Sequence, residues 1–504
     1  MAATVGSALN WWARTKGDQT ALIVAEDRLT YRELHDWSSR LARRLADDGV
    51  KPGDRVGLLG SNTLAWPVAA LAIVKTGAVL VPLNARLKPA EIRKVADDSG
   101  LSLLISSPPL VTAAHEARAG GREFAVVDFD IVDAHRFGTS DDFRIDRAPD
   151  DPIAVIFTSG STGLSKGVIL TTATLLGIVL ENTLTQEGFS PGTVTLLLLP
   201  LAFTPGLVYG VLVTTVLGGT LIVEPELNPS RAVGLIAEHR VRALFGVPLI
   251  FEALSKTPEF DHADLSSLQT AIIGGAAVPT DLLGRWAAKG VLLRQIYGMT
   301  EAGGVATATL AHEALEHPGS CGIGSIFTDV AVMGADGALL GPGELGELVV
   351  RGPGVTPGYW EAPEETAAAI HGGWLHSGDL GTSDESGRIT FVDRLKDLII
   401  SGGINISPVE LEAVIAGLDG VSEVAVIAAA DSRFGETPAA IVTGLVDDEA
   451  AVIRHCEALL SDYKVPRYVV LRTEPLPRLP SGKLDKRAIR EEYRDVAERF
   501  PRAR

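Results

Sequence analysis

Short apolar stretches alternate with amphipathic helical stretches from near the start of the chain to about residue 310. The first long helical pattern, 34–45, follows Thr30 and Glu33, whose spacing matches a helix-capping box. Further patterns follow in order: strand 56–59, strand 78–82, helix 89–98 and strand 101–105. Because parallel strands are joined by crossover connections, usually helices, this alternation predicts an α/β fold with parallel sheets covered by helices.

The length of the chain and a change of pattern after Pro318 indicate more than one domain. At 504 residues, the chain exceeds the roughly 250–300 residues at which a single core stops growing. After Pro318, short alternating strands between Gly and Pro turns predict a small β unit, and from about residue 397 the pattern is that of an α+β lobe. We therefore predict a large N-terminal domain of residues 1–395, made of parallel α/β subdomains and the β unit, and a smaller α+β C-terminal domain of residues 396–504.

The charge of the chain limits its partners. The formal net charge is −18, so the protein as a whole repels the phosphate backbone of nucleic acids and an anionic membrane surface. We therefore expect no nucleic-acid partner. An anionic small molecule needs a local cluster of donors that overrides the overall field.

The cysteines and the first residues indicate a cytoplasmic protein. Only Cys321 and Cys456 occur, far apart and without metal-ligand spacing, which fits a reducing compartment. The opening MAATVGSALNWWARTKGD lacks a basic region followed by an apolar run, so we expect no signal peptide.

One uncharged stretch, 188–223, is long enough to span a membrane. Three prolines and several glycines interrupt it, which argues against a transmembrane helix. We instead predict a strand at 194–199, a loop, a helix near 207–217 and a strand at 220–223, all buried in the α/β core.

The strongest functional signal is the loop TSGSTGLSKG at 158–167. It follows the strand pattern 153–157, and open α/β sheets bind ligands at the carboxyl ends of their strands. Glycines allow close backbone approach, and hydroxyls and a lysine can bind phosphate; the residues are Thr158, Ser159, Gly160, Ser161, Thr162, Gly163 and Lys166. The spacing is not that of a Walker A loop. Gly/Ser/Thr clusters are also common in surface turns, so the loop alone leaves both interpretations open.

This loop resembles the phosphate-loop signature of the adenylate-forming superfamily, which includes acyl-CoA synthetases, peptide-synthetase adenylation domains and firefly-type luciferases. Further motifs follow in the family's order, so the resemblance covers nearly the whole chain. It implies a mobile C-terminal domain and an enzyme of the acyl-CoA synthetase or fatty-acid–CoA ligase type. It also implies ATP, Mg²⁺ and coenzyme A as cofactor and co-substrates.

A second motif, Tyr297–Glu301, resembles the family's YGxTE sequence. The resemblance implies that Tyr297 stacks on adenine, that Thr300 contacts the α-phosphate and that Glu301 holds Mg²⁺, for which an oxygen ligand is suitable. The resemblance places further residues beside the adenine: Gly275, Ala276, Ala277, Gly298 and Met299.

The C-terminal motifs complete the resemblance. Asp379 and Arg394 correspond to the residues that hold the ribose, and Lys483 to the catalytic lysine. The remaining matches are Lys396 at the hinge and Gly402 and Gly403 in the tunnel for the pantetheine arm of CoA. Without the resemblance, a lysine in a basic tail is simply a surface residue.

The expected acyl pocket departs from the family pattern at one position. Phe203 stands where relatives often have a histidine that gates the pocket. Phe203 can still gate the pocket by rotation, but it cannot titrate. The residues expected around the acyl group are Phe203, Val208, Gly274, Gly303 and Gly304.

These residues indicate an apolar fatty or ring-containing acid, which is converted to acyl-AMP and then transferred to CoA. No aspartate is placed to bind an amino acid's ammonium group. Two alternatives stay open: an acyl-AMP ligase that loads a carrier protein, and a nucleotide-binding module without turnover. A homodimer and peripheral membrane contact also stay open.

Overall fold

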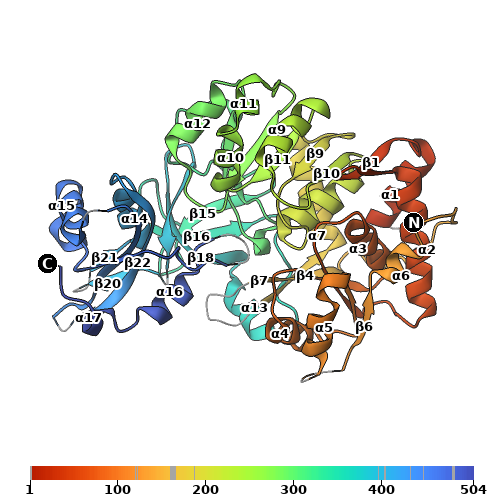
Figure 1. Cartoon of the computed structure of the whole chain (residues 1–504), viewed down its shortest axis with the longest axis horizontal. Helices are drawn as coiled ribbons and strands as arrows, with labels where there is room; N and C mark the ends of the chain where they lie inside the picture. The colour runs from red at the N-terminus through yellow and green to blue at the C-terminus, as the bar shows by residue number, and fades with distance from the viewer. Residues whose placement is uncertain are drawn as a thin grey trace. The chain divides into compact units, whose positions relative to one another are not determined.

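The computed structural model describes residues 3–119, 121, 123–158, 166–186, 188–395, 397–401, 404–431, 433–446, 448–479 and 483–503 (Figure 1). The chain forms two compact units, each made of two segments. The first unit comprises Met1–Val330 and Val349–His376. The second comprises Ala331–Leu348 and Ser377–Arg504.

The first unit contains an eight-stranded sheet whose central strands are parallel. Its order is β14 (Thr307–Ala308), β13 (Leu293–Tyr297), β12 (Thr270–Gly274), β11 (Ala243–Gly246), β9 (Val194–Leu197), β10 (Thr220–Val223), β1 (Thr20–Val24) and β2 (Asp27–Thr30). Only the edge pairs β1–β2 and β13–β14 are antiparallel among the pairings described. The helices between these strands are α9 (Pro229–Glu238), α10 (Pro248–Ser255), α11 (Pro258–His262) and α12 (Thr280–Ala287). Their apolar faces form one core with the sheet, centred on Phe251 and Trp286.

A six-stranded sheet in the same unit has the order β6 (Ala125–Asp128), β5 (Leu103–Ser106), β3 (Arg55–Gly60), β4 (Val79–Asn84), β7 (Pro152–Thr158) and β8 (Lys166–Thr171). Its pairings are parallel except between β7 and β8. The associated helices are α1 (Val5–Thr15), α2 (Tyr31–Asp47), α3 (Ala65–Lys75), α4 (Pro89–Ser99), α5 (Val111–Arg118), α6 (Asp130–Asp133) and α7 (Thr172–Thr185), with a short 3₁₀ turn η1 (Pro108–Leu110). The predicted parallel sheets covered by helices are confirmed.

The helix α2 begins as its sequence predicts. The Thr30 hydroxyl accepts from the Glu33 backbone N–H at 3.2 Å, and the Glu33 carboxylate accepts from the Thr30 N–H at 2.8 Å. The predicted apolar stripe of Leu34, Trp37 and Leu41 is buried.

The uncharged stretch forms β9, a helical segment and β10, as predicted. The helical part is wider than an ordinary α-helix: η2 (Pro205–Val213) is a π-helix, followed by α8 (Thr214–Val216). Gly206 is required at its start, because a Cβ there would collide with the backbone of Pro200 and Leu201. Across the described ranges, the structure contains no helix of the length and apolar character that a membrane crossing requires.

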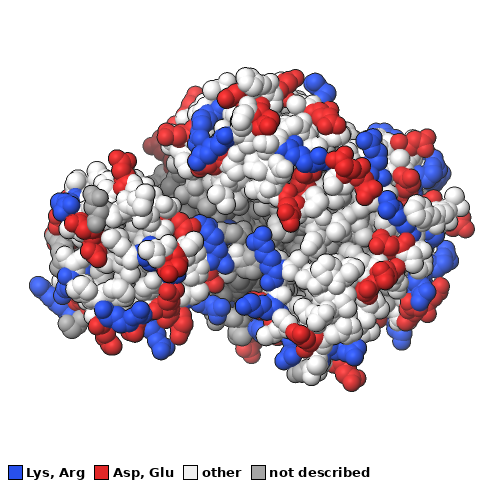
Figure 2. Space-filling view, in the orientation of Figure 1, with Lys and Arg blue, Asp and Glu red and all other residues white. Residues whose placement is uncertain are grey.

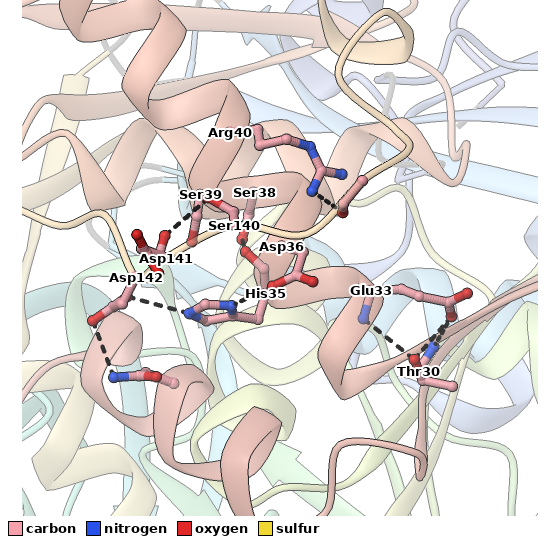
Figure 3. Close-up of polar contacts among 12 residues, drawn as sticks. Thr30, Glu33, His35, Asp36, Ser38, Ser39, Arg40, Ser140, Asp141 and Asp142 are labelled. Atoms are coloured by element: carbon pink, nitrogen blue, oxygen red, sulfur yellow. Dashed lines mark hydrogen bonds and ion pairs between the residues drawn. The ribbon is translucent and has the colours of Figure 1, made fainter.

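A connecting segment, 134–151, runs to β7 without helix or strand and lies along α2 (Figure 3). Arg40 of α2 donates to the carbonyls of His135 at 2.9 Å and Arg136 at 2.8 Å, and also to that of Gly138. In Figure 3, His35 lies between Asp36 and Asp142, with nitrogen–oxygen distances of 3.0 and 3.3 Å. These polar contacts position a segment that has little apolar surface of its own.

A five-stranded sheet follows in the chain, formed by β15 (Asp329–Met333), β16 (Gly346–Arg351), β18 (Trp374–Ser383), β17 (Ile370–His371) and β19 (Ile389–Arg394). It contains the predicted small β unit. The other elements of this region are η3 (Thr300–Ala302), η4 (Ala311–Glu313) and α13 (Pro363–Ala369).

The second unit also contains the α+β lobe. Its five-stranded sheet consists of β21 (Ile404–Ile406), β20 (Ile399–Ser401), β23 (Gly435–Gly444), β22 (Val421–Asp431) and β24 (Tyr468–Arg472). The helical elements are α14 (Pro408–Ala416), α15 (Glu449–Leu459), η5 (Asp462–Lys464), α16 (Lys486–Glu492) and α17 (Val496–Arg499). Successive residues of β22 enter different cores, with Val426 on the α14–α15 side and Ile427 on the α16–α17 side.

Candidate functional site

Both ends of the predicted phosphate loop are ordered by strand pairing. Thr158 ends β7 and lies opposite Lys166, the first residue of β8. The loop residues Ser159, Gly160, Ser161, Thr162 and Gly163 fall outside the described residues. The structure thus places the two flanking residues side by side at the carboxyl end of a parallel strand, where ligands of such sheets bind.

A buried carboxylate lies near this loop. Glu301 follows β13 in the turn η3 and is 8% exposed. Its Oε1 accepts from the Tyr359 hydroxyl at 3.1 Å, and the Lys166 ammonium lies 4.7 Å from the centre of the Tyr359 ring. Burial and, secondarily, the charge of Glu301 raise the pKa of Tyr359, so the phenol remains a donor. Tyr359 therefore connects the loop lysine to the carboxylate.

Sequence reasoning missed Tyr359. It lies in the segment Pro357–Trp360, whose only local signal is a Pro-Gly turn before two aromatic residues. A turn of that kind does not indicate which distant residues its aromatic side chains contact.

A small cavity adjoins these residues. Its lining comprises Ile156, Val168, Ile169, Leu170, Thr204, Val208, Thr300, Gly303, Gly354 and Thr356. The Thr204 and Thr300 hydroxyls are 2.8 Å apart on its wall. Three predicted site residues therefore share one cavity: Thr300, Val208 and Gly303. Three predicted acyl-site residues, Phe203, Gly274 and Gly304, are not among those that line it.

The predicted adenine residues include several glycines with a demonstrable steric role. A Cβ at Gly298 would collide with the Gly304 carbonyl, and one at Gly274 would collide with the Ile296 side chain. Gly275 has a φ of 81°, which favours glycine. Ala276 and Ala277 are exposed just after β12, whereas Tyr297 is only 7% exposed.

Three predicted residues of the second unit come together although they are far apart in the sequence. The antiparallel register of β18 and β19 places Asp379 opposite Arg394, with 3.4 Å between Oδ1 and Nε. The side chain of Lys483 reaches solvent, yet nearby protein removes part of its hydration, and this desolvation lowers its pKa. Arg394 lowers it further and Asp379 opposes the change. Lys396, Gly402 and Gly403 lie outside the described residues.

The segment 199–204, which carries Phe203, is held at both ends. The Asn62 side-chain amide donates to the carbonyls of Leu199 and Glu224, each at 3.1 Å, and its oxygen accepts from the Leu201 N–H at 2.9 Å. The other end is held by the Thr204–Thr300 contact. Sequence reasoning missed Asn62, since a single asparagine after a strand usually just marks a turn.

On the face shown in Figure 2, basic side chains are interspersed with acidic ones. A net charge of −18 is therefore compatible with positive charge at particular places, such as Lys166 or Arg394. The described residues contain no cluster of three or more His, Cys, Asp or Glu side chains suited to a metal. A cation at Glu301 would need oxygens from a bound ligand as well.

The sequence matches two family descriptions. Residues 9–360 match the AMP-binding enzyme family, and residues 410–483 match the AMP-binding enzyme C-terminal domain. A feruloyl-CoA synthase of Amycolatopsis sp is 40% identical over 491 residues, covering 95% of this chain and 97% of the relative. The long-chain-fatty-acid–CoA ligase FadD13 of Mycobacterium tuberculosis is 35% identical over 479 residues, covering 92% and 93%.

Solved structures also resemble this chain over nearly its whole length. A Mycobacterium tuberculosis fatty acyl CoA synthetase matches with a TM-score of 0.80 and 34% identity, covering 98% of this chain and 99% of that one. ATP-bound MatB from Rhodopseudomonas palustris matches with a TM-score of 0.88 and 29% identity, covering 98% and 100%.

Proposed function

The chain belongs to the AMP-binding enzyme family, and from that premise we propose which acid it activates and which residues act. The protein is an ATP-dependent acyl-CoA ligase: it forms acyl-AMP from a carboxylic acid and ATP, then transfers the acyl group to CoA. Its relatives include ligases named for fatty and for ring-containing acids, which supports a substrate of one of these kinds.

We propose that the acid is apolar, with a fatty or ring-containing acyl group. One observation carries this proposal: among the residues that the structure describes, every one lining the cavity beside Thr300 is apolar, glycine or threonine. A cavity without a charged residue offers no partner for an amino acid's ammonium group or for a second carboxylate, and burying either without a partner is costly. Relatives named feruloyl-CoA synthase and long-chain-fatty-acid–CoA ligase are consistent with this class.

Adenylation requires a carboxylate oxygen to approach a polyanionic phosphate, so charge must be offset and geometry held. We propose that Lys166, Thr158 and the intervening loop bind the β- and γ-phosphates, and that Thr300 binds the α-phosphate. Adenine is assigned to Tyr297 and its neighbours. Attack on the α-phosphate then gives acyl-AMP and releases pyrophosphate.

Glu301 is suited to hold Mg²⁺ together with the phosphates. It is a buried carboxylate at the end of a parallel strand, and Tyr359 holds one of its oxygens in place. Mg²⁺ commonly binds one or two carboxylates and substrate phosphates, so a single glutamate is sufficient. When bound, the ion would offset negative charge on the phosphates.

The second unit supplies the remaining groups. We propose that Asp379 and Arg394 bind the ribose hydroxyls. Lys483 would contact both the acid's carboxylate and the α-phosphate. We further propose that the functional boundary lies between residues 395 and 396, with Lys396 as the hinge. Rotation there would remove Lys483 and bring Gly402 and Gly403 to the CoA thiol.

A panel of carboxylic acids tests the proposed function. AMP formation should require ATP, CoA and an apolar acid, and amino acids and dicarboxylates should be inactive. Replacing Glu301 with glutamine should reduce turnover by roughly a hundredfold and raise the Mg²⁺ concentration needed for half-maximal rate, because the neutral amide binds the cation weakly. AMP formation that depends on a holo-carrier protein instead of CoA, or a preference for amino acids, would contradict the proposal.

Asn62 provides a second test, through the segment it holds. Replacing Asn62 with alanine removes three hydrogen bonds and should raise KM for the acid about tenfold, equivalent to roughly 1.4 kcal/mol, while KM for ATP stays unchanged. Steady-state kinetics with each substrate varied separately measures this. The neighbouring exposed Ser61, replaced by alanine, is the matched control. Equal changes in both KM values would show a general loss of structure instead.

A further inference from the structure

Tyr209 lies beside Gly303 and Gly304, two residues that the sequence analysis places in the acyl pocket. It lies in the middle of η2 and is 2% exposed. A Cβ built on Gly304 would lie 2.7 Å from the Cε2 atom of the Tyr209 ring. Gly304 has a φ of 106°, a backbone conformation that favours glycine. The aromatic ring therefore packs directly on the turn that follows Glu301.

The hydroxyl of Tyr209 holds the ring in this position. It donates to the Gly303 carbonyl at 3.2 Å. The side chain of Asn182 and the backbone of Val305 also hydrogen-bond the phenol, and burial raises its pKa, so it remains protonated. Asn182 is itself held by the Ile178 carbonyl at 2.7 Å. A buried ring with its polar end bonded in this way does not leave its position without breaking several contacts.

Other aromatic rings fill the space behind Tyr209. The centre of the Phe245 ring lies 5.0 Å from that of Tyr209, and the Phe189 ring lies 5.5 Å from Phe245. All three side chains are buried. Close packing of this kind leaves no channel between them for an alkyl chain.

The cavity that contains the Thr204 and Thr300 hydroxyls adjoins residues that neighbour Tyr209. Val208, the residue before Tyr209, and Gly303, which accepts from its hydroxyl, both line that cavity. Any acyl group that extends from the cavity past the Gly303–Gly304 turn would meet the Tyr209 ring.

We propose that Tyr209 forms the closed end of the acyl pocket and determines specificity, so that the enzyme prefers short-chain or single-ring acids to long-chain fatty acids. The inference rests on the proposed function, because it assumes that the cavity beside Thr300 receives the acyl group. The inference predicts the size of the substrate's acyl group, which neither the family nor the names of the relatives indicate.

Acyl-sulfamoyl adenosines, which mimic acyl-AMP and do not react, test this without turnover. The dissociation constants of the butanoyl and hexadecanoyl compounds are compared by calorimetry for three proteins: wild type, Tyr209→Leu and Tyr209→Phe. The wild type should bind the long compound at least about tenfold more weakly than the short one. Leucine shortens the side chain yet keeps it apolar, so Tyr209→Leu should remove that difference. Tyr209→Phe loses only the hydroxyl and should keep the difference in affinity between the two compounds.

Each outcome decides the question. Equal affinity of the wild type for both compounds, or an unchanged ratio in a Tyr209→Leu protein that binds ATP normally, would overturn the role of Tyr209. Failure of the proposed function has a different signature: the wild type would bind ATP but would form no AMP with any apolar acid. Because the affinity measurement needs no turnover, it still decides the role of Tyr209 in that event.

Discussion

Replacing Lys483 with alanine is expected to slow acyl-AMP formation by about a hundred- to a thousandfold, while transfer from supplied acyl-AMP to CoA changes only a few-fold. The ammonium group would stabilise negative charge where the carboxylate meets the α-phosphate. Removing one donor aimed at developing charge typically costs a factor of this size. In the second half-reaction the acid is already an anhydride and no longer carries a carboxylate charge, so that cation is not needed to bring it to the phosphate.

The two half-reactions are measured separately. Acid-dependent exchange between pyrophosphate and ATP reports adenylation, and CoA-dependent release of AMP from synthetic acyl-AMP reports thioester formation. Arg487→Ala, an exposed position four residues along the same segment, is the matched control and should leave both rates unchanged. Equal losses in both half-reactions for Lys483→Ala would disprove the division of labour.

The pH dependence of adenylation provides an independent check on Lys483. The reactive form is the charged ammonium, which is lost as pH rises through its pKa. Desolvation, followed by the effect of Arg394, lowers that pKa. The rate should therefore decline at a lower pH than an ordinary lysine would give, and it should do so in adenylation but not in thioester formation.

Replacing Lys75 with methionine is expected to stabilise the protein at pH 7 by roughly 2 kcal/mol. Lys75 is 2% exposed, and its ammonium donates only to the Ser39 hydroxyl at 2.7 Å and the His35 carbonyl at 3.3 Å among the bonds described. Burial lowers its pKa from 10.5 to about 7, with Arg144 adding to the effect; Asp142 and Asp36 oppose it.

The sign of the effect follows from proton linkage. The folded pKa lies below the unfolded one, so between about pH 7 and 10.5 the unfolded chain binds more protons and stability rises with pH. At pH 7 the cost of burying this lysine is on the order of 4 kcal/mol, since one pKa unit corresponds to 1.36 kcal/mol. Methionine removes this cost but loses two hydrogen bonds of about 1 kcal/mol each, which gives the expected gain.

Urea unfolding of wild type and variant at several pH values measures this difference. The advantage of Lys75→Met should be largest below about pH 7 and should shrink by about 1.4 kcal/mol per pH unit as the pH rises toward 9. Lys94→Met is the matched control: Lys94 forms a partly exposed ion pair with Asp98, and its loss should change stability by less than about 0.5 kcal/mol. A destabilised Lys75→Met protein at pH 7 would show that the lysine is charged and well paired in the fold.

The sequence by itself predicted many of the local elements and supplied the residues that are proposed for the site. The capping box at Thr30 and Glu33 and the apolar stripe of α2 act through neighbours within a few residues, so their structure follows from local pattern. The strand–helix–strand pattern within 188–223 was predictable for the same reason. Gly206 shows the limit of such reasoning: its necessity comes from the close approach of Pro200 and Leu201, and the π-helical form of η2 was not predicted.

Only the tertiary structure decided which residues meet. Tyr359 joins Lys166 to Glu301, Asn62 holds the segment that carries Phe203, and Tyr209 fills the space beside Gly304. Each contact joins side chains from elements that are distant along the chain, and the order of strands in the sheets brings these elements together. A glycine in a sequence indicates missing side-chain volume, but packing determines whether a ligand or a neighbouring aromatic ring occupies that volume.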